Sequence, residues 1–203
     1  MTNALNFSFA FLADTLSPVR DEHVETADDR DIRATLGGDE DGYRRLVDRH
    51  QGEIAKRLRK FSRDPRVLEE LVHDTFVEAY FSLKCFRGDA PFIHWLHRIA
   101  VRVGYKYWKS KKIAGRTSSI DGHDVATGSR AVGGAQAEEK ETEAIERALN
   151  QLSPRDRLVV TLMYLEERSV EETATLTGWS KTMVKVQAFR ARGKLRKIME
   201  SQR

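Results

Sequence analysis

Apolar residues recur at intervals of three and four along most of the chain, which is the pattern of helices that bury one face. In the first half, this pattern predicts helices over residues 28–36, 39–61, 64–86 and 91–112. The third helix has a clear start at Asp64–Pro65, because an acid caps a helix and a proline is tolerated at the first helical position. No stretch alternates strictly between apolar and polar residues as a half-buried strand does, so we predict an all-α fold.

The helical pattern stops over residues 113–137, where five glycines stand among serines and threonines. This composition is typical of a flexible linker and divides the chain into two small helical domains, residues 28–112 and 138–203. Residues 1–27 combine an apolar segment with an acidic stretch and are predicted to form a flexible arm. The second domain begins with an acidic helix, and Ser153–Pro154 starts the helix after it.

Residues 169–195 predict two short helices joined by a tight turn. Gly178 supplies the turn, because glycine enters the left-handed region without a side-chain penalty, and Ser180 is placed to cap the second helix. One face of the second helix is apolar and consists of Val184, Ala188, Ala191, Leu195 and Ile198. The opposite, outer face carries Lys181, Thr182, Lys185, Val186, Phe189 and Arg190. This layout is typical of a helix-turn-helix whose second helix enters the DNA major groove; the alternative is an ordinary helical hairpin with a solvated basic face.

Composition narrows the class of protein. The 203 residues are 40% hydrophobic and 33% charged, and no apolar run approaches the roughly 20 residues that cross a bilayer. Residues 1–12 are apolar but lack a basic leader, so no signal peptide is predicted. The single cysteine, Cys85, excludes an internal disulfide and a four-cysteine zinc site, which favours a reducing cytoplasm.

The net charge of +4 conceals an uneven distribution of charge. Residues 14–41 are strongly acidic, whereas residues 90–120 contain no acid and residues 179–203 are strongly basic, so two basic blocks are available to contact one polyanion. The first block contains a basic ridge along one helix, formed by Arg98, Arg102, Lys106 and Lys109. Three aromatic residues lie among these bases, namely Tyr105, Tyr107 and Trp108. Their rings would either stack on unpaired nucleotides or close the end of a helical core.

With both halves laid out, the chain resembles the extracytoplasmic-function subgroup of the bacterial sigma-70 family. The resemblance covers residues 29–199 and rests on short motifs that occur in the family's order across both domains. These are Gly38-Asp39, LVHDTF at 71–76, FRGDAPFIHWLHRIA at 86–100, Ala148-Leu149, LSPRDR at 152–157, SVEETA at 169–174 and RAR at 190–192. Members of this subgroup are initiation factors that keep only the second and fourth sigma domains, so the resemblance implies promoter recognition without catalysis.

The resemblance also implies a role for each surface. The outer face of the second helix in the helix-turn-helix would read the −35 element. A flipped base of the melted −10 element would be held by the basic ridge together with a loop formed by Arg87, Gly88, Asp89 and Ala90. Docking on the clamp helices of the largest polymerase subunit would use Glu70, Leu71, His73, Asp74, Phe76 and Glu78. The implied partners are the polymerase core (clamp helices and flap), promoter DNA and an anti-sigma factor, often membrane-tethered, that wedges between the two domains.

Some positions depart from the residues that are common in the family. Val186 offers only apolar contact to a base edge, whereas Gln187 can pair with adenine, so the promoter sequence cannot be copied from other members. His73 stands where glutamine is common in the docking motif, and Arg102 stands where asparagine is common.

Other classes of function fit the sequence less well. His94 and His97 lie three apart near Asp89, but helical histidine pairs without further ligands are mostly structural, so neither a metal nor a cofactor is predicted. No glycine-rich phosphate loop or nucleophile motif indicates an enzyme. Two alternatives to an initiation factor stay open. A decoy that titrates an anti-sigma protein would not need the basic outer face, and a dimeric helix-turn-helix regulator would not need the distant basic and aromatic helix.

Overall fold

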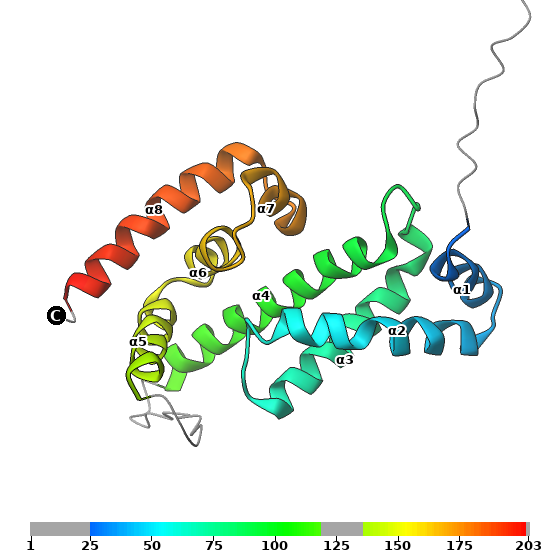
Figure 1. The fold of residues 1–203 in the computed structure, drawn as a ribbon, viewed down its shortest axis with the longest axis horizontal. Helices are drawn as coiled ribbons and strands as arrows, with labels where there is room; N and C mark the ends of the chain where they lie inside the picture. Colours follow the sequence, from blue (N-terminus) through cyan, green and yellow to red (C-terminus); the bar gives the residue numbers. More distant parts are fainter. Residues whose placement is uncertain (1–24, 119–135, 202–203) are drawn as a thin grey trace, which may run out of the picture.

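The computed structural model describes residues 25–118 and 136–201, and every regular element in these two ranges is helical (Figure 1). The first range contains α1 (Ala27–Leu36), α2 (Glu40–Leu58), α3 (Pro65–Ser82), the 3₁₀ turn η1 (Leu83–Cys85) and α4 (Phe92–Ser118). The second contains α5 (Gln136–Gln151), α6 (Pro154–Val160), the π-helical turn η2 (Thr161–Leu165), α7 (Val170–Thr177) and α8 (Lys181–Glu200). The predicted all-α class is confirmed. Among these helices, none is long and apolar enough to cross a membrane.

The helix starts follow from local capping chemistry. The Asp64 carboxylate accepts a hydrogen bond from the Arg66 N–H at 2.9 Å, and Pro65 occupies the first helical position of α3. At α7, Ser169 and Glu172 cap each other's backbone N–H groups in a reciprocal capping box. Because these signals lie within four residues of each boundary, the sequence alone was sufficient to locate the starts.

Helices α2, α3 and α4 form the first domain around an apolar core. Its fully buried side chains include Leu46, Ile54, Leu58, Leu83, Leu96 and Ile99. Helix α4 passes close to the end of α2, where the Trp108 indole N–H donates to the Phe61 carbonyl at 2.9 Å. A Cβ added at Gly104 would lie 2.4 Å from the Phe61 ring, so glycine permits this close approach.

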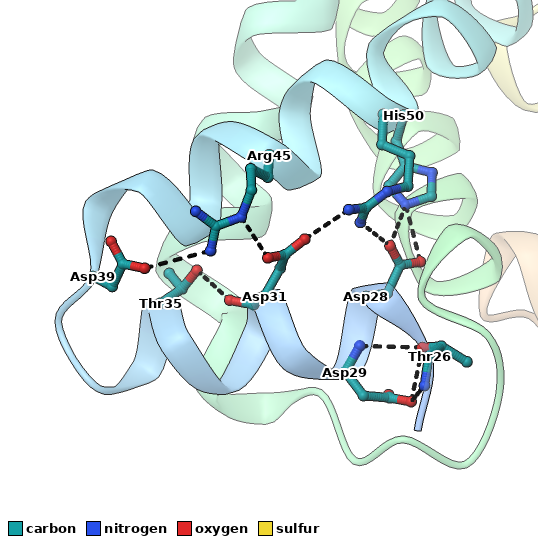
Figure 2. Close-up of polar contacts among 9 residues, drawn as sticks. Thr26, Asp28, Asp29, Asp31, Thr35, Asp39, Arg45 and His50 are labelled. Carbon is teal, nitrogen blue, oxygen red and sulfur yellow. Dashed lines mark hydrogen bonds and ion pairs between the residues drawn. The ribbon is translucent and has the colours of Figure 1, made fainter. Parts of the chain in front are cut away.

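Ionic contacts hold α1 against α2 (Figure 2). The buried Asp31 carboxylate accepts from Arg45 Nε at 2.6 Å and from Arg49 Nη2 at 2.7 Å. Burial alone would raise the pKa of Asp31, but the two guanidinium groups outweigh it and lower the pKa below its ordinary value. Asp28 pairs with Arg49 and lies 3.0 Å from the His50 ring. Charge pairing, together with burial of Ile32 in the apolar core, therefore positions α1.

The predicted linker needs a correction at its start. Helix α4 continues past residue 112 as far as Ser118, because Ile113, Ala114 and Arg116 are compatible with a helix and a single glycine weakens a helix without ending it. Residues 119–135 of the predicted linker, and the predicted arm up to residue 24, lie outside the described residues. The last two residues of the predicted linker, 136 and 137, already belong to α5.

The two halves of the chain pack directly on each other, with α6 and α7 beside α4 (Figure 1). Leu158 and Leu162 from the second half belong to the same buried apolar cluster as Leu96 and Ile99 from the first. This contact was not predicted from the sequence. The two basic surfaces nevertheless stay exposed, as described next.

Candidate nucleic-acid and protein interfaces

The turn between α7 and α8 has helix-turn-helix geometry. Gly178 adopts a φ of 74°, in the left-handed region that glycine enters freely, and its N–H donates to the Ala174 carbonyl at 2.9 Å. Ser180 then caps α8 by accepting from the Met183 N–H at 3.2 Å. An ion pair of 3.0 Å between Lys181 and Glu171 also links the two helices.

Helix α8 has the predicted division between a buried and an outer face. Val184, Ala188 and Ala191 are buried. All six residues predicted for the outer face are exposed, namely Lys181, Thr182, Lys185, Val186, Phe189 and Arg190. Phe189 keeps 72% of its surface exposed, which is unusual for so large an apolar side chain. The outer face is therefore a basic surface with an apolar centre.

Asp156 on α6 fixes the orientation of α8 and was missed as a site residue. Its buried carboxylate accepts from Lys194 Nζ at 2.7 Å, from Gln187 Nε2 at 2.5 Å and from Ser153 Oγ at 2.7 Å. Burial alone would raise its pKa, but these donors hold the pKa below its ordinary value. The suggestion that Gln187 pairs with adenine is corrected, because its amide is already engaged inside the domain.

The loop after η1 is exposed at every position predicted to hold a flipped base. These residues are Arg87, Gly88, Asp89 and Ala90. Gly88 adopts a φ of 78°, which favours glycine at this point of the loop. Phe86 and Phe92 flank the loop with ring centroids 5.4 Å apart, and Trp95 lies 5.5 Å from both. This aromatic cluster anchors both ends of the loop.

All four residues of the basic ridge on α4 are exposed, but two of them are paired. Glu78 on α3 lies 3.0 Å from Arg102 and 3.4 Å from Lys106. The predicted polymerase contact Glu78 thus partly neutralises the ridge in this structure. Arg98 and Lys109 add further positive charge towards the two ends of the ridge.

The three aromatic residues among the ridge bases are not free platforms for nucleotides. Trp108 is only 4% exposed, and the Arg157 guanidinium lies 4.1 Å from its ring centroid. Tyr105 packs edge-on against Trp179 of the second half, and Lys111 lies 5.8 Å from the Tyr107 ring. For Trp108, the interpretation that it closes a helical core is the right one.

The residues of α3 that were predicted to dock on polymerase are not all exposed. Glu70, His73 and Asp74 are exposed, whereas Leu71 and Phe76 are 4% and 6% exposed and belong to the core. Leu71 lies in the core and lines no part of this surface, so its prediction as a direct contact is corrected. Phe76 is also part of the core but lines the floor of the groove described next.

Three exposed apolar residues extend the stripe on α3 and were missed. Val77, Tyr80 and Phe81 keep 38%, 49% and 80% of their surfaces exposed. They line a largely apolar groove of about 560 Å³ together with Tyr43 and Val47 of α2. The available signal was that they follow Asp74 by three, six and seven residues, which is one face of a helix, but the same spacing also fits a wide buried stripe.

The histidine pair is part of the protein's packing. His97 is half-buried and lies 2.9 Å from Glu53 of α2. Burial, reinforced by the positive charges of Arg57 and Arg168, lowers the pKa of His97 to about 4. Within the two described ranges, no group of three or more histidine, cysteine or acidic side chains could hold a metal ion.

Comparisons with known proteins agree with this architecture. Sigma-70 region 2 matches residues 46–113, and Sigma-70 region 4 matches residues 142–195. The ECF RNA polymerase sigma-E factor of Haemophilus influenzae is 30% identical over 165 residues, which are 76% of this chain and 86% of that protein. The sigma-E factor of Escherichia coli K12 is 28% identical over the same length, covering 85% of that protein.

Solved structures share the fold. The sigma factor RpoE in complex with the anti-sigma factor NepR, from Bartonella quintana, superposes with a TM-score of 0.53 at 22% identity, covering 79% of this chain and 98% of that one. CnrH in complex with the cytosolic domain of CnrY gives the same TM-score at 24% identity, covering 88% of this chain and all of the other.

The chain belongs to the extracytoplasmic-function sigma factors of the sigma-70 family. It directs promoter recognition by RNA polymerase and is not an enzyme, because sigma factors bind core polymerase and promoter DNA without catalysing a reaction themselves. A plain helix-turn-helix regulator is excluded as a class, since region 2 is present as well as region 4.

Proposed function

We propose that the outer face of α8 reads the −35 element of this factor's promoters. The observation that carries the proposal is the exposed set of Lys185, Val186, Phe189 and Arg190 opposite a buried apolar face. Lysine and arginine supply phosphate or guanine contacts in a major groove, and the apolar centre suits thymine methyl groups.

The −10 element is assigned to the exposed loop Arg87–Ala90 and to the neighbouring basic ridge of α4. Extruding a base from the stack costs a few kcal/mol, so it requires a receiving loop of fixed shape and cations for the phosphates. The aromatic cluster of Phe86, Phe92 and Trp95 supports that loop. On binding DNA, phosphates would replace Glu78 as the partner of Arg102 and Lys106.

Polymerase docking is assigned to the exposed stripe of α3. It combines the polar residues Glu70, His73 and Asp74 with the apolar Val77, Tyr80 and Phe81. An apolar centre with a polar rim is the usual composition of a protein interface. Since NepR is an anti-sigma factor bound to a protein of this fold, a cytoplasmic anti-sigma partner, tethered to the membrane in some families, is proposed for this chain too.

Run-off transcription tests the assignment. Purified protein is added to bacterial core polymerase with genomic fragments, and the expected result is initiation at new start sites that core enzyme alone does not use. The Lys185→Ala, Arg190→Ala double variant should reduce this initiation, whereas Arg196→Ala on the same helix should not. If the double variant initiates as well as the wild type, the assignment of the −35 element to the outer face of α8 is wrong.

A further inference from the structure

We propose that Asp28 of α1 and His50 of α2 are positioning residues for the Arg87–Ala90 loop, and that they fix the shape of this loop through the ring of Phe92. The proposal rests on the assignment of the loop to a flipped base of the −10 element. It extends that assignment to two residues that lie outside the loop and on other helices.

A continuous chain of contacts leads from α1 to the loop. Nε2 of the buried His50 ring lies 3.0 Å from each carboxylate oxygen of Asp28 (Figure 2). The ring centroid of His50 lies 5.7 Å from that of Phe92, the first residue of α4. Phe92 is only 3% exposed and contacts Phe86 and Trp95 in the aromatic cluster that anchors both ends of the loop. A shift of the His50 ring would therefore be transmitted to the loop.

Helix α1 can hold Asp28 in place because α1 is itself fixed against α2. Arg49 pairs with both Asp28 and Asp31, so two carboxylates about one turn apart on α1 share one guanidinium. A Cβ added at Gly42 of α2 would lie 2.9 Å from the Asp31 carbonyl, so glycine lets the two helices come close. A rotation of α1 that moved Asp28 away from His50 would also disturb these contacts.

Histidine suits the position between Asp28 and Phe92 because its ring combines an apolar body with a polar edge. An ionised carboxylate only accepts hydrogen bonds, so the His50 Nε2–H donates to Asp28 and the ring is held in one orientation. An apolar ring would pack on Phe92 without being held by Asp28. An amide side chain would bond to Asp28 without offering a ring to Phe92.

The loop needs support from outside because its own residues supply little. All four are exposed, and neither Arg87 nor Asp89 makes a side-chain hydrogen bond or ion pair with another described residue. A loop that receives a flipped base binds best when its shape already exists in the free protein, since ordering it on binding costs free energy. The rings at its two ends, Phe86 and Phe92, therefore determine how well it is preorganised.

Hydrogen exchange of the free full-length protein, followed by NMR, tests the positioning role without DNA. The N–H groups of Phe86 and His94 make backbone hydrogen bonds of 3.0 and 2.9 Å at the two ends of the loop. Asp28→Ala should make both amides exchange several-fold faster while the amides of α8 keep their rates. The matched control Asp48→Ala removes an exposed acid of α2 and should leave all of these rates unchanged.

Base discrimination by the holoenzyme tests the consequence for promoter recognition. The probes are promoters selected from random sequence, made with a single-stranded −10 element that carries an intact base or an abasic site at each position in turn. Asp28→Ala and His50→Gln should each reduce the preference for the intact flipped base several-fold, with the affinity for core polymerase unchanged. A general loss of stability would not alter this ratio. The double variant should lose no more than the weaker single variant, because Asp28 acts through His50.

Unchanged exchange at both ends of the loop in Asp28→Ala would overturn the proposal, and so would additive losses in the double variant. If Asp28→Ala loses its helical circular dichroism, His50→Gln removes the ring next to Phe92, and unchanged exchange in that variant would also overturn it. If the ends of the loop loosen as expected but Arg87→Ala and Asp89→Ala discriminate like the wild type, the promoter assignment of the loop is rejected and its positioning stands.

Discussion

Lys194 Nζ of α8 donates to the buried carboxylate of Asp156 at 2.7 Å, although the lysine itself is mostly exposed. The same carboxylate accepts from Gln187, which lies about two helical turns before Lys194 on α8. Two points along the recognition helix are therefore tied to the start of α6. Asp156 also accepts from Ser153, the residue that caps α6. One buried anion thus sets both where α6 begins and how α8 is oriented.

Asp156→Asn should lower the free energy of unfolding by about 2 kcal/mol, because a hydrogen bond to a charged group is lost and Lys194 is left without its partner. The variant should also weaken binding to the −35 element, since α8 is no longer fixed at two points. Urea unfolding followed by circular dichroism measures the first effect. Asp48→Asn, on the exposed side of α2, is the control and should change stability by less than about 0.5 kcal/mol.

His97 should make the protein less stable in acid. Its pKa is lowered to about 4 from the ordinary 6.5, first by burial and then by Arg57, His94 and Arg168. The unfolded chain therefore binds a proton at this site more readily than the folded chain. The stability associated with neutral His97 is complete above pH 6.5 and declines as the pH falls towards 4.

The measurement is the free energy of unfolding from urea titrations between pH 7.5 and 4.5. The wild type should lose more stability over this range than His97→Gln does. The control His73→Gln, at an exposed position on α3, should follow the wild type. If the free energy of unfolding changed with pH in the same way for wild type and His97→Gln, His97 would protonate equally well in the folded and the unfolded chain.

The helices and the outer face of α8 were predictable because they depend on signals within one or two turns. Caps such as Asp64 and Ser180 act on neighbouring backbone groups. The helical period alone places Val184 on the buried face of α8 and Lys185 on the outer face. The contact of Arg57 with Glu166 joins residues 109 positions apart, and no local pattern encodes that pairing. The period of α3 does separate buried Phe76 from exposed Phe81, but it cannot show that an exposed apolar residue belongs to an interface.

Gly104→Ala should destabilise the first domain in spite of alanine's better helix propensity. The new Cβ would lie 2.4 Å from the Phe61 ring, which is confined by Trp108 at a centroid distance of 4.5 Å. Overpacking of this kind costs about 1–3 kcal/mol. Gly52→Ala, in the middle of α2 with nothing within 4 Å of the added Cβ, should instead stabilise by roughly 1 kcal/mol. Thermal unfolding of the two variants should therefore shift in opposite directions.

Phe81→Ser should weaken binding to core polymerase about tenfold or more without affecting the fold. Phe81 is 80% exposed, so its removal leaves the core intact, and large aromatic residues at interface centres dominate binding energies. Leu36→Ser removes an exposed apolar residue from α1 and is the matched control. Fluorescence anisotropy with core enzyme gives both affinities. An unchanged affinity for Phe81→Ser would remove the apolar half of the proposed docking stripe.

Lys185→Ala and Arg190→Ala should each weaken recognition of the −35 element, by about 1–3 kcal/mol wherever the lost contact is to a base edge. Both side chains are exposed on the outer face of α8, whereas the control Arg196 is paired with Glu200 at the far end of the helix. Binding is measured with holoenzyme on promoters selected from random sequence, at several salt concentrations. A base-reading residue relaxes the sequence preference when it is removed. A phosphate-binding residue instead weakens every sequence equally and reduces the salt slope by about one.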